Sequence, residues 1–182
     1  MGRFFSLIVV ILLSAVAVAI PHNGNEVAAA PAGDPIDYAK AIMLDAESLA
    51  EGGIGQAYAL LIEQSTDLKV DWLPLDENFE GQEQGSDEGL SYRVTLGGKT
   101  DFVFGSPPGQ DHWAMATATF FDIVNRQLVD RPFKFYALME GNDLQAIALT
   151  EKEFAAAKRY HAGTRYGPYL PTKTPPHYGA PQ

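Results

Sequence analysis

The sequence predicts an α+β fold, in which helices pack on one face of an antiparallel sheet. Residues 90–104 and 133–149 each contain two runs of strand-forming residues around a short turn that is rich in Gly, Asn or Asp, which is typical of a β-hairpin. A stretch with helical features follows each hairpin. The expected order is therefore two successive β-β-α units after an N-terminal pair of helices.

The first helix of the N-terminal pair is expected to begin at Asp34-Pro35, where an acidic N-cap precedes a proline in the first turn. Apolar residues then recur at helical spacing, and Gly52-Gly53 is expected to end the helix. We predict a second helix over residues 56–64, for which a buried strand is the alternative.

A strand and an acidic loop are expected next. Side chains alternate over residues 68–72, which indicates a short strand that ends before Pro74. Residues 76–89 contain six acidic residues and neither Lys nor Arg, and they are expected to form a loop.

Residues 113–128 are compatible with two structures. Residues 114–121 alternate as in a strand, but the length of the apolar stretch favours a helix, because most strands have four to eight residues. Asp111 stands where the N-cap of this helix is expected, and His112 is expected on the surface rather than in a catalytic pair.

The second hairpin leads directly into Thr150-Glu151-Lys152-Glu153. This is the S/T-x-x-E pattern of a capping box, in which the threonine and the last glutamate bond each other's backbone. We therefore expect a helix over residues 151–161 and the end of the folded domain near Gly163.

The two ends of the chain differ in composition from the middle. Residues 1–19 combine one arginine, an apolar run and an Ala-Val-Ala site, which predicts a secretory signal peptide. A retained membrane anchor is the alternative, although the run is shorter than the roughly 20 residues that a spanning helix needs. Residues 20–33 are expected to be a disordered lead-in, residues 34–163 a single domain, and residues 164–182 a flexible tail rich in Pro, Gly and Tyr.

Composition excludes several classes of function. The formal net charge is −10 at pH 7, so nucleic acid and anionic membrane surfaces are not expected as partners. The chain has no cysteine, which excludes a thiol nucleophile and a cysteine zinc site. The sequence also lacks the motifs of P-loop proteins, serine hydrolases and zinc proteases.

The acidic stretch carries a candidate metal site. Asp76, Asn78, Glu80 and Asp87 form the pattern D-x-N-x-E-G-x5-D, which resembles a calcium-binding loop. The pattern departs from that loop at its fifth, eighth and last positions, and Pro74 prevents a helix from leading into it. We favour an acidic solvated loop without metal, weak Ca²⁺ binding is the alternative, and no other cofactor is expected.

Two further groups are candidates for binding a partner. Glu140, Asn142 and Asp143 form a polar cluster in the turn of the second hairpin, where turn formation alone is the favoured explanation and a binding role is the alternative. Tyr166 and Tyr169 lie in the tail, where a PxxP segment is typical of proline-rich docking peptides and equally of disordered ends.

These observations predict a small, soluble, exported binding or protein-interaction module, periplasmic or extracellular, with a protein partner and without a stable membrane span once the signal peptide is removed. The sequence does not identify its ligand. Two alternatives remain open: an extracytoplasmic hydrolase that uses carboxylates from loops, and an envelope-associated structural protein. No catalytic constellation in the sequence favours an enzyme.

Overall fold

The computed structural model describes residues 33–80, 91–105, 111–174 and Gly179, and it confirms the α+β class. The α-helices are α1 (Ala46–Ser48), α2 (Ile54–Gln64), α3 (His112–Asn125) and α4 (Glu151–Tyr160). Shorter helical segments are η1 (Tyr38–Lys40), η2 (Leu49–Gly53), η3 (Thr66–Leu68), η4 (Arg126–Leu128) and η5 (Gly141–Asp143). Within these residues, no helix is long and apolar enough to span a membrane.

The described strands form two antiparallel sheets, whereas the sequence analysis expected one. The strands are β1 (Ile42–Met43), β2 (Leu75–Glu80), β3 (Ser91–Leu96), β4 (Lys99–Gly105), β5 (Phe133–Leu138) and β6 (Gln145–Thr150). One sheet has the order β2-β3-β4 and the other the order β1-β6-β5. The two predicted hairpins are both present, but each belongs to a different sheet.

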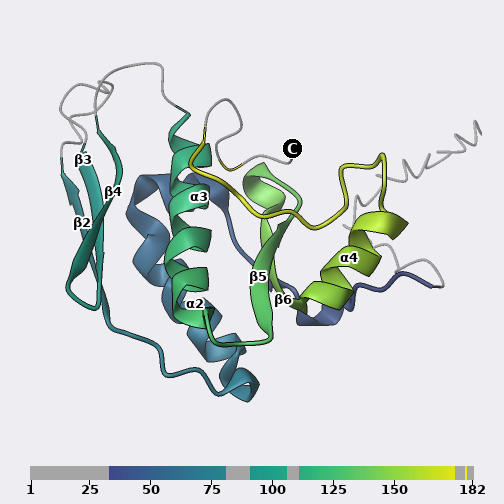
Figure 1. Cartoon of the computed structure of the whole chain (residues 1–182). Helices are drawn as coiled ribbons and strands as arrows, with labels where there is room; N and C mark the ends of the chain where they lie inside the picture. The colour runs from purple at the N-terminus through teal and green to yellow at the C-terminus, as the bar shows by residue number, and fades with distance from the viewer. Residues whose placement is uncertain (1–32, 81–90, 106–110, 175–178, 180–182) are drawn as a thin grey trace, which may run out of the picture.

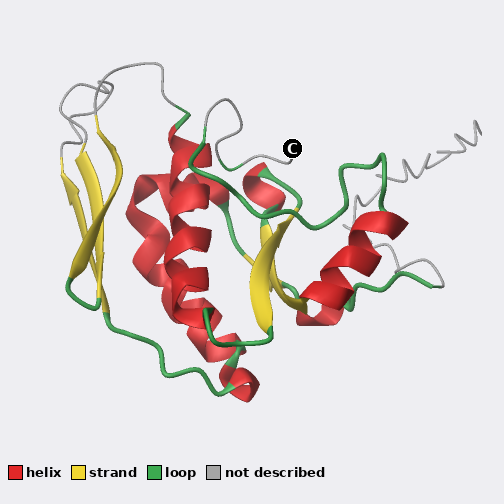
Figure 2. Ribbon diagram, viewed as in Figure 1, coloured by secondary structure: helices red, strands yellow, loops and turns green. Residues whose placement is uncertain are grey.

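The elements stack in layers, which Figure 1 shows from left to right as the β2-β3-β4 sheet, helices α2 and α3, the β1-β6-β5 sheet, and helix α4. The same alternation of strands and helices is visible in Figure 2. The main hydrophobic core lies in the helical layer between the sheets. A second core lies on the other face of the β1-β6-β5 sheet, where Ile36 and Ala157 pack against Tyr136, Leu138 and Ile147. Helices therefore cover both faces of this sheet rather than one.

Helix α3 confirms the prediction of a helix, rather than a strand, within residues 113–128. Its buried residues are Ala116, Thr117, Ala118, Thr119, Phe120, Phe121, Ile123 and Val124. A helix that is buried on almost every side contacts apolar neighbours in all directions, as α3 does between the two sheets. This burial explains why the sequence lacks a clean amphipathic period here.

The first hairpin forms as its alternation predicts. Tyr92, Val94 and Leu96 on β3 are buried against the helical layer. Gly97 and Gly98 have φ values of 54° and 83°, in the left-handed region that glycine adopts at low cost. The second hairpin pairs β5 with β6 from Phe133↔Thr150 to Leu138↔Gln145.

The predicted capping box is confirmed at the start of α4. The backbone N–H of Glu153 donates to the Thr150 hydroxyl at 3.3 Å, and the backbone N–H of Thr150 donates to the Glu153 carboxylate at 2.8 Å. These hydrogen bonds to Thr150 hold the pKa of Glu153 below its ordinary value, because they favour the charged carboxylate.

The prediction of a helix from Asp34 is wrong. The Asp34 carboxylate accepts the backbone N–H of Ile36 at 2.9 Å and lies 3.1 Å from His161 Nε2, so it anchors an irregular segment instead of capping a helix. The helix begins only after Asp45, whose carboxylate caps α1. Gly52, with a φ of 89°, interrupts the helical backbone between α1 and α2, as expected of the glycines that end the first helix.

The strand predicted over residues 68–72 is also wrong, because residues 69–74 have no regular structure. The strand lies further on, as β2, in the first part of the loop expected over residues 76–89. Phe79 explains the shift, since its ring packs edge-on against Tyr92 with the ring centroids 5.2 Å apart. The remainder of that expected loop lies outside the described residues.

The outer edge of β5 is covered by the Asn125 side chain and by the C-terminal segment, whose described residues are 164–174 and Gly179. Asn125 Nδ2 donates to the carbonyl of Phe135 at 2.8 Å, and the N–H of Phe135 donates to Asn125 Oδ1 at 2.8 Å. Two residues along the strand, Ala137 and Tyr169 exchange backbone hydrogen bonds of 2.8 and 2.9 Å. Sheet edges otherwise invite pairing with other chains, and these bonds satisfy that edge.

The structure therefore differs from the expectation that the folded domain ends near Gly163. Tyr169 is only 4 % exposed and belongs to the main hydrophobic core. Its hydroxyl donates to the carbonyl of Met139 at 2.8 Å. The proline-rich composition predicts a flexible tail, whereas Tyr169 in this segment forms a bridge to β5.

We predict that Asn125→Ala lowers the free energy of unfolding by about 2–3 kcal/mol, because it leaves the N–H and C=O of Phe135 without partners. Urea denaturation followed by circular dichroism measures this change. Asn78→Ala, at an exposed asparagine that bonds only Glu80, is the matched control and should change stability by less than about 0.5 kcal/mol. Equal effects of the two variants would contradict the prediction.

We also predict that removal of residues 164–182 destabilises the fold by about 3–5 kcal/mol, since a buried aromatic residue is lost with the strand partner of Ala137. Tyr169→Ala in the full chain should reproduce most of this loss. Thermal and urea unfolding of both variants measure it. A truncated chain as stable as the full chain would contradict the role of this segment.

Candidate functional site

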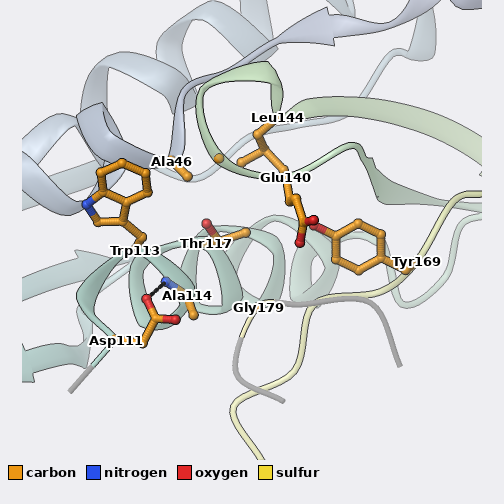
Figure 3. A pocket seen from close by; sticks show the side chains of 10 residues that line it. Ala46, Asp111, Trp113, Ala114, Thr117, Glu140, Leu144, Tyr169 and Gly179 are labelled. Carbon is orange, nitrogen blue, oxygen red and sulfur yellow. Dashed lines mark hydrogen bonds between the residues drawn. The ribbon is translucent and has the colours of Figure 1, made fainter. Parts of the chain in front are cut away.

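The candidate site is a pocket of about 270 Å³ where the N-terminal half of α3 meets the β5–β6 turn, the start of α1 and the C-terminal segment. Figure 3 shows it from close by. The described residues that line it are Ala46, Asp111, Trp113, Ala114, Thr117, Glu140, Gly141, Leu144, Tyr169 and Gly179. They come from four segments that are far apart in the sequence, so only the tertiary fold creates this site.

Glu140 is brought to the pocket by an unusual backbone conformation. The preceding residue, Met139, has a φ of 58°, in the left-handed region that a long side chain seldom adopts. The hydrogen bond from the Tyr169 hydroxyl to the Met139 carbonyl fixes this residue. In the described part of the chain, the Glu140 carboxylate forms neither a hydrogen bond nor an ion pair.

Asp111 and Trp113 come from the first turn of α3. The Asp111 carboxylate accepts the backbone N–H of Ala114 at 3.0 Å and so confirms the predicted N-cap. The Trp113 ring is 42 % exposed, although tryptophan is usually covered in folded proteins. Close by, the ring of His112 stacks on Phe104 at 4.2 Å and its Nε2 is buried, so His112 is not the surface residue that we expected.

The C-terminal segment completes the wall of the pocket. Gly179 lies against α3 so closely that a Cβ atom there would be 2.3 Å from the carbonyl oxygen of Ala114. Its N–H donates to the carbonyl of Thr172 at 3.0 Å. Any side chain at position 179 would push this segment off the helix.

Tyr169 is a neutral polar group at the edge of the pocket. Burial raises the pKa of its hydroxyl well above the ordinary value, and the negative charge of Glu140 raises it further. The hydroxyl therefore stays protonated and remains a hydrogen-bond donor at neutral pH.

The described lining includes two carboxylates and two aromatic rings, and it includes no Lys, Arg or His. Carboxylates attract cations, and aromatic faces bind them through the ring quadrupole. A Thr117 hydroxyl also lines the pocket, but a nucleophile needs an adjacent base to act. The arrangement therefore suits recognition of a positively charged group.

Of the residues that the sequence analysis selected for binding, Tyr169 lines the pocket. Asn142 and Asp143 lie in the same β5–β6 turn but outside the lining, and Asn142 contacts Glu47 at 3.4 Å. Tyr166 is exposed on the tail, with the Arg165 guanidinium over its ring. Glu140 belongs to the polar cluster of that turn, whereas no sequence signal connects Trp113 and Thr117 with it.

The calcium candidates are not brought together as a loop. Asp76, Asn78 and Glu80 lie on β2, paired with β3, and Asp87 is outside the described residues. Among the residues that the structure describes, no group of three His, Asp or Glu side chains is placed to hold a metal ion. Calcium binding stays a prediction.

A second polar cluster joins the start of the described chain to the C-terminus of α4. Asp34, whose side chain is fully buried, contacts His161 Nε2 at 3.1 Å and accepts a hydrogen bond from the Tyr38 hydroxyl at 3.2 Å. Burial and the neighbouring Asp34 raise the pKa of Tyr38 to about 12. None of its three residues lines the pocket, and their side chains contact one another, so we assign the cluster a structural role.

Comparisons with models of protein families, with curated proteins and with solved structures find no match for this chain. The function of the pocket must therefore be inferred from its own residues.

We predict that stability falls steeply above about pH 10 and that Tyr169 is one cause. The folded state holds the Tyr169 proton more tightly than the unfolded state, in which tyrosine ionises near pH 10. This contribution is therefore complete below that pH and is lost as the pH rises above it, by at most about 1.4 kcal/mol per pH unit for each such tyrosine. Buried Tyr92, whose pKa is likewise raised by burial, adds to the effect.

Urea unfolding between pH 8 and 11 measures this dependence. Tyr169→Phe should make the decline less steep, and Tyr166→Phe, at an exposed tyrosine of the same segment, controls for the number of tyrosines. An unchanged decline in Tyr169→Phe would contradict the assignment.

Proposed function

We propose that this protein is an exported binding module whose pocket accepts a positively charged group, such as a lysine or arginine side chain of a partner protein. The observation that carries the proposal is the Glu140 carboxylate, which lines the pocket and has no partner among the described residues. A charge without a partner at the wall of a pocket is available to a ligand at little cost, because no internal ion pair has to be broken.

The aromatic rings of Trp113 and Tyr169 also favour a positively charged ligand. Trp113 is 42 % exposed in the free protein, so a cation or its alkyl stem in the pocket would cover part of this ring. Tyr169 keeps its proton, so its ring faces the ligand as a neutral aromatic group. Asp111 adds a second negative charge, although part of it is offset by the N-terminus of α3.

The size of the pocket limits what can bind. About 270 Å³ lies just below the roughly 300–1,000 Å³ that is usual for drug-sized ligands. One side chain or one small amine suits this volume. Export belongs to the proposal as well, and the signal-peptide pattern of residues 1–19 supports it.

One observation favours a second candidate, a hydrolase that uses loop carboxylates. Asp111 and Glu140 come from different segments and line the same pocket, as the two carboxylates of a glycosidase do. The hydrogen bond to Ala114 commits Asp111 to capping a helix, which favours the binding module. Hydrolysis of a chromogenic glycoside by the protein, lost in Glu140→Gln, would support the hydrolase instead.

We predict that the protein binds Nα-acetyl-lysine N-methylamide with a dissociation constant in the millimolar range, and that Glu140→Gln weakens this binding about tenfold, or about 1.4 kcal/mol. Trp113 fluorescence measures the binding in a Trp72→Phe background, which leaves Trp113 as the single tryptophan. Raising the salt concentration should weaken binding further, because the attraction is electrostatic.

Asp143→Asn is the matched control, since Asp143 lies in the same turn, carries the same charge and does not line the pocket. It should change the dissociation constant less than twofold. The norleucine analogue, which has a similar stem without the charge, should bind at least tenfold more weakly. Equal binding of the two analogues would contradict a pocket for cations.

A further inference from the structure

A second recess lies beside the open edge of the β1-β6-β5 sheet. It has a volume of about 480 Å³, and its lining includes Met43, Leu44, Asp45, Ala57, Leu60 and Glu63. The recess runs between β1 and the outer face of α2. We call it the β1 groove.

The hydrogen-bond register shows that β1 has a free backbone edge. The N–H of Leu44 donates to the carbonyl of Leu144 at 2.8 Å, and Ile42 is opposite Ala146. In an antiparallel pair, alternate residues bond the partner strand, so the N–H and C=O of Met43 point away from β6. These groups face the side on which the described residues place no strand.

This edge differs from the opposite edge of the same sheet. At β5, the outward backbone groups of Phe135 and Ala137 are hydrogen-bonded to Asn125 and Tyr169. Proteins commonly protect sheet edges in such ways, and an edge left open beside an apolar recess is a site for strand addition. The Met43 side chain is 55 % exposed there.

The negative charge of the groove indicates that its partner is basic. Asp45 and Glu63 are the charged residues among the described lining, which contains no Lys, Arg or His. A second copy of this acidic chain would bring the same carboxylates together, and like charges at close range repel each other. Apolar Leu44, Ala57 and Leu60 provide the remaining surface.

We propose that the β1 groove binds an extended segment of a partner protein that adds to the sheet as a strand next to β1 and presents both apolar and basic side chains on the face that meets α2. Its backbone bonds the N–H and C=O of Met43, its groove-facing apolar side chains pack on Leu60 and Ala57, and a groove-facing basic side chain lies near Asp45 and Glu63. This surface is separate from the pocket of Glu140 and does not depend on the function proposed for that pocket.

The test is an NMR titration of the ¹⁵N-labelled protein with acetyl-Val-Thr-Lys-Thr-Val-amide, in which the two valines and the lysine share one face of the strand, and with the Glu-for-Lys peptide as its matched control. The basic peptide should shift the amide signals of Met43, Ala57 and Leu60. It should also slow hydrogen exchange at the Met43 amide at least tenfold at saturation. The acidic peptide should leave both unchanged.

Two variants test separately the contribution of the β1 backbone edge and the contribution of the groove's negative charge. Met43→Pro removes the outward N–H without breaking a bond to β6, and it should abolish binding. Glu63→Lys keeps the backbone edge intact. It should weaken binding of the basic peptide at least fivefold and should allow the acidic peptide to bind. Glu47→Lys, a charge reversal outside the groove lining, is the control for net charge.

Three results would overturn the proposal. One is the absence of any shift at Met43 with 5 mM basic peptide. Another is equal binding of the acidic peptide by the original protein. The third is protection of the Met43 amide that appears without peptide as the protein concentration rises, because that result assigns the edge to a second copy.

Discussion

Burial of α3 between two sheets is the constraint on which the rest of the structure depends. Its middle is buried, with Thr117 and Thr119 as the polar residues there, and its charged and amide side chains lie towards its ends. At the C-terminal end, Asn125 bonds the backbone of β5, and Arg126 pairs with Asp101 of β4 at 2.5 Å. The C-terminal end of α3 is therefore bonded to both sheets. At the other end, Asp111 caps the helix and lines the pocket.

The C-terminal segment connects stability to the candidate site. Tyr169 closes the edge of β5, enters the main core and bonds the carbonyl of Met139. Met139 is held in a left-handed conformation, which carries a cost of about 1–3 kcal/mol that the surroundings must offset. That conformation brings Glu140 to the pocket. The same tyrosine thus stabilises the fold, fixes the strained residue and forms part of the pocket wall.

Local signals in the sequence were sufficient for both hairpins, the capping box of α4 and helix α3. The errors arose where the deciding partner is remote in sequence. Asp34 looks like a helix cap, but its partner is His161, and Tyr169 looks like part of a free tail, but its partner is Ala137. The sequence does not reveal strand β2, because four of its six residues are polar and exposed, while Leu75 and Phe79 pack against the main core. The pocket has no sequence signature, since four separate segments form it.

The short helix α1 separates the two recesses, because Ala46 lines the pocket and the neighbouring Asp45 lines the β1 groove. Both recesses have acidic linings, and the net charge of −10 attracts any basic partner toward the whole surface. At physiological ionic strength this attraction is screened beyond roughly 8 Å. Long-range charge therefore speeds the encounter without choosing the partner. Selection has to come from short-range features, which are the rings beside Glu140 and the backbone groups of Met43.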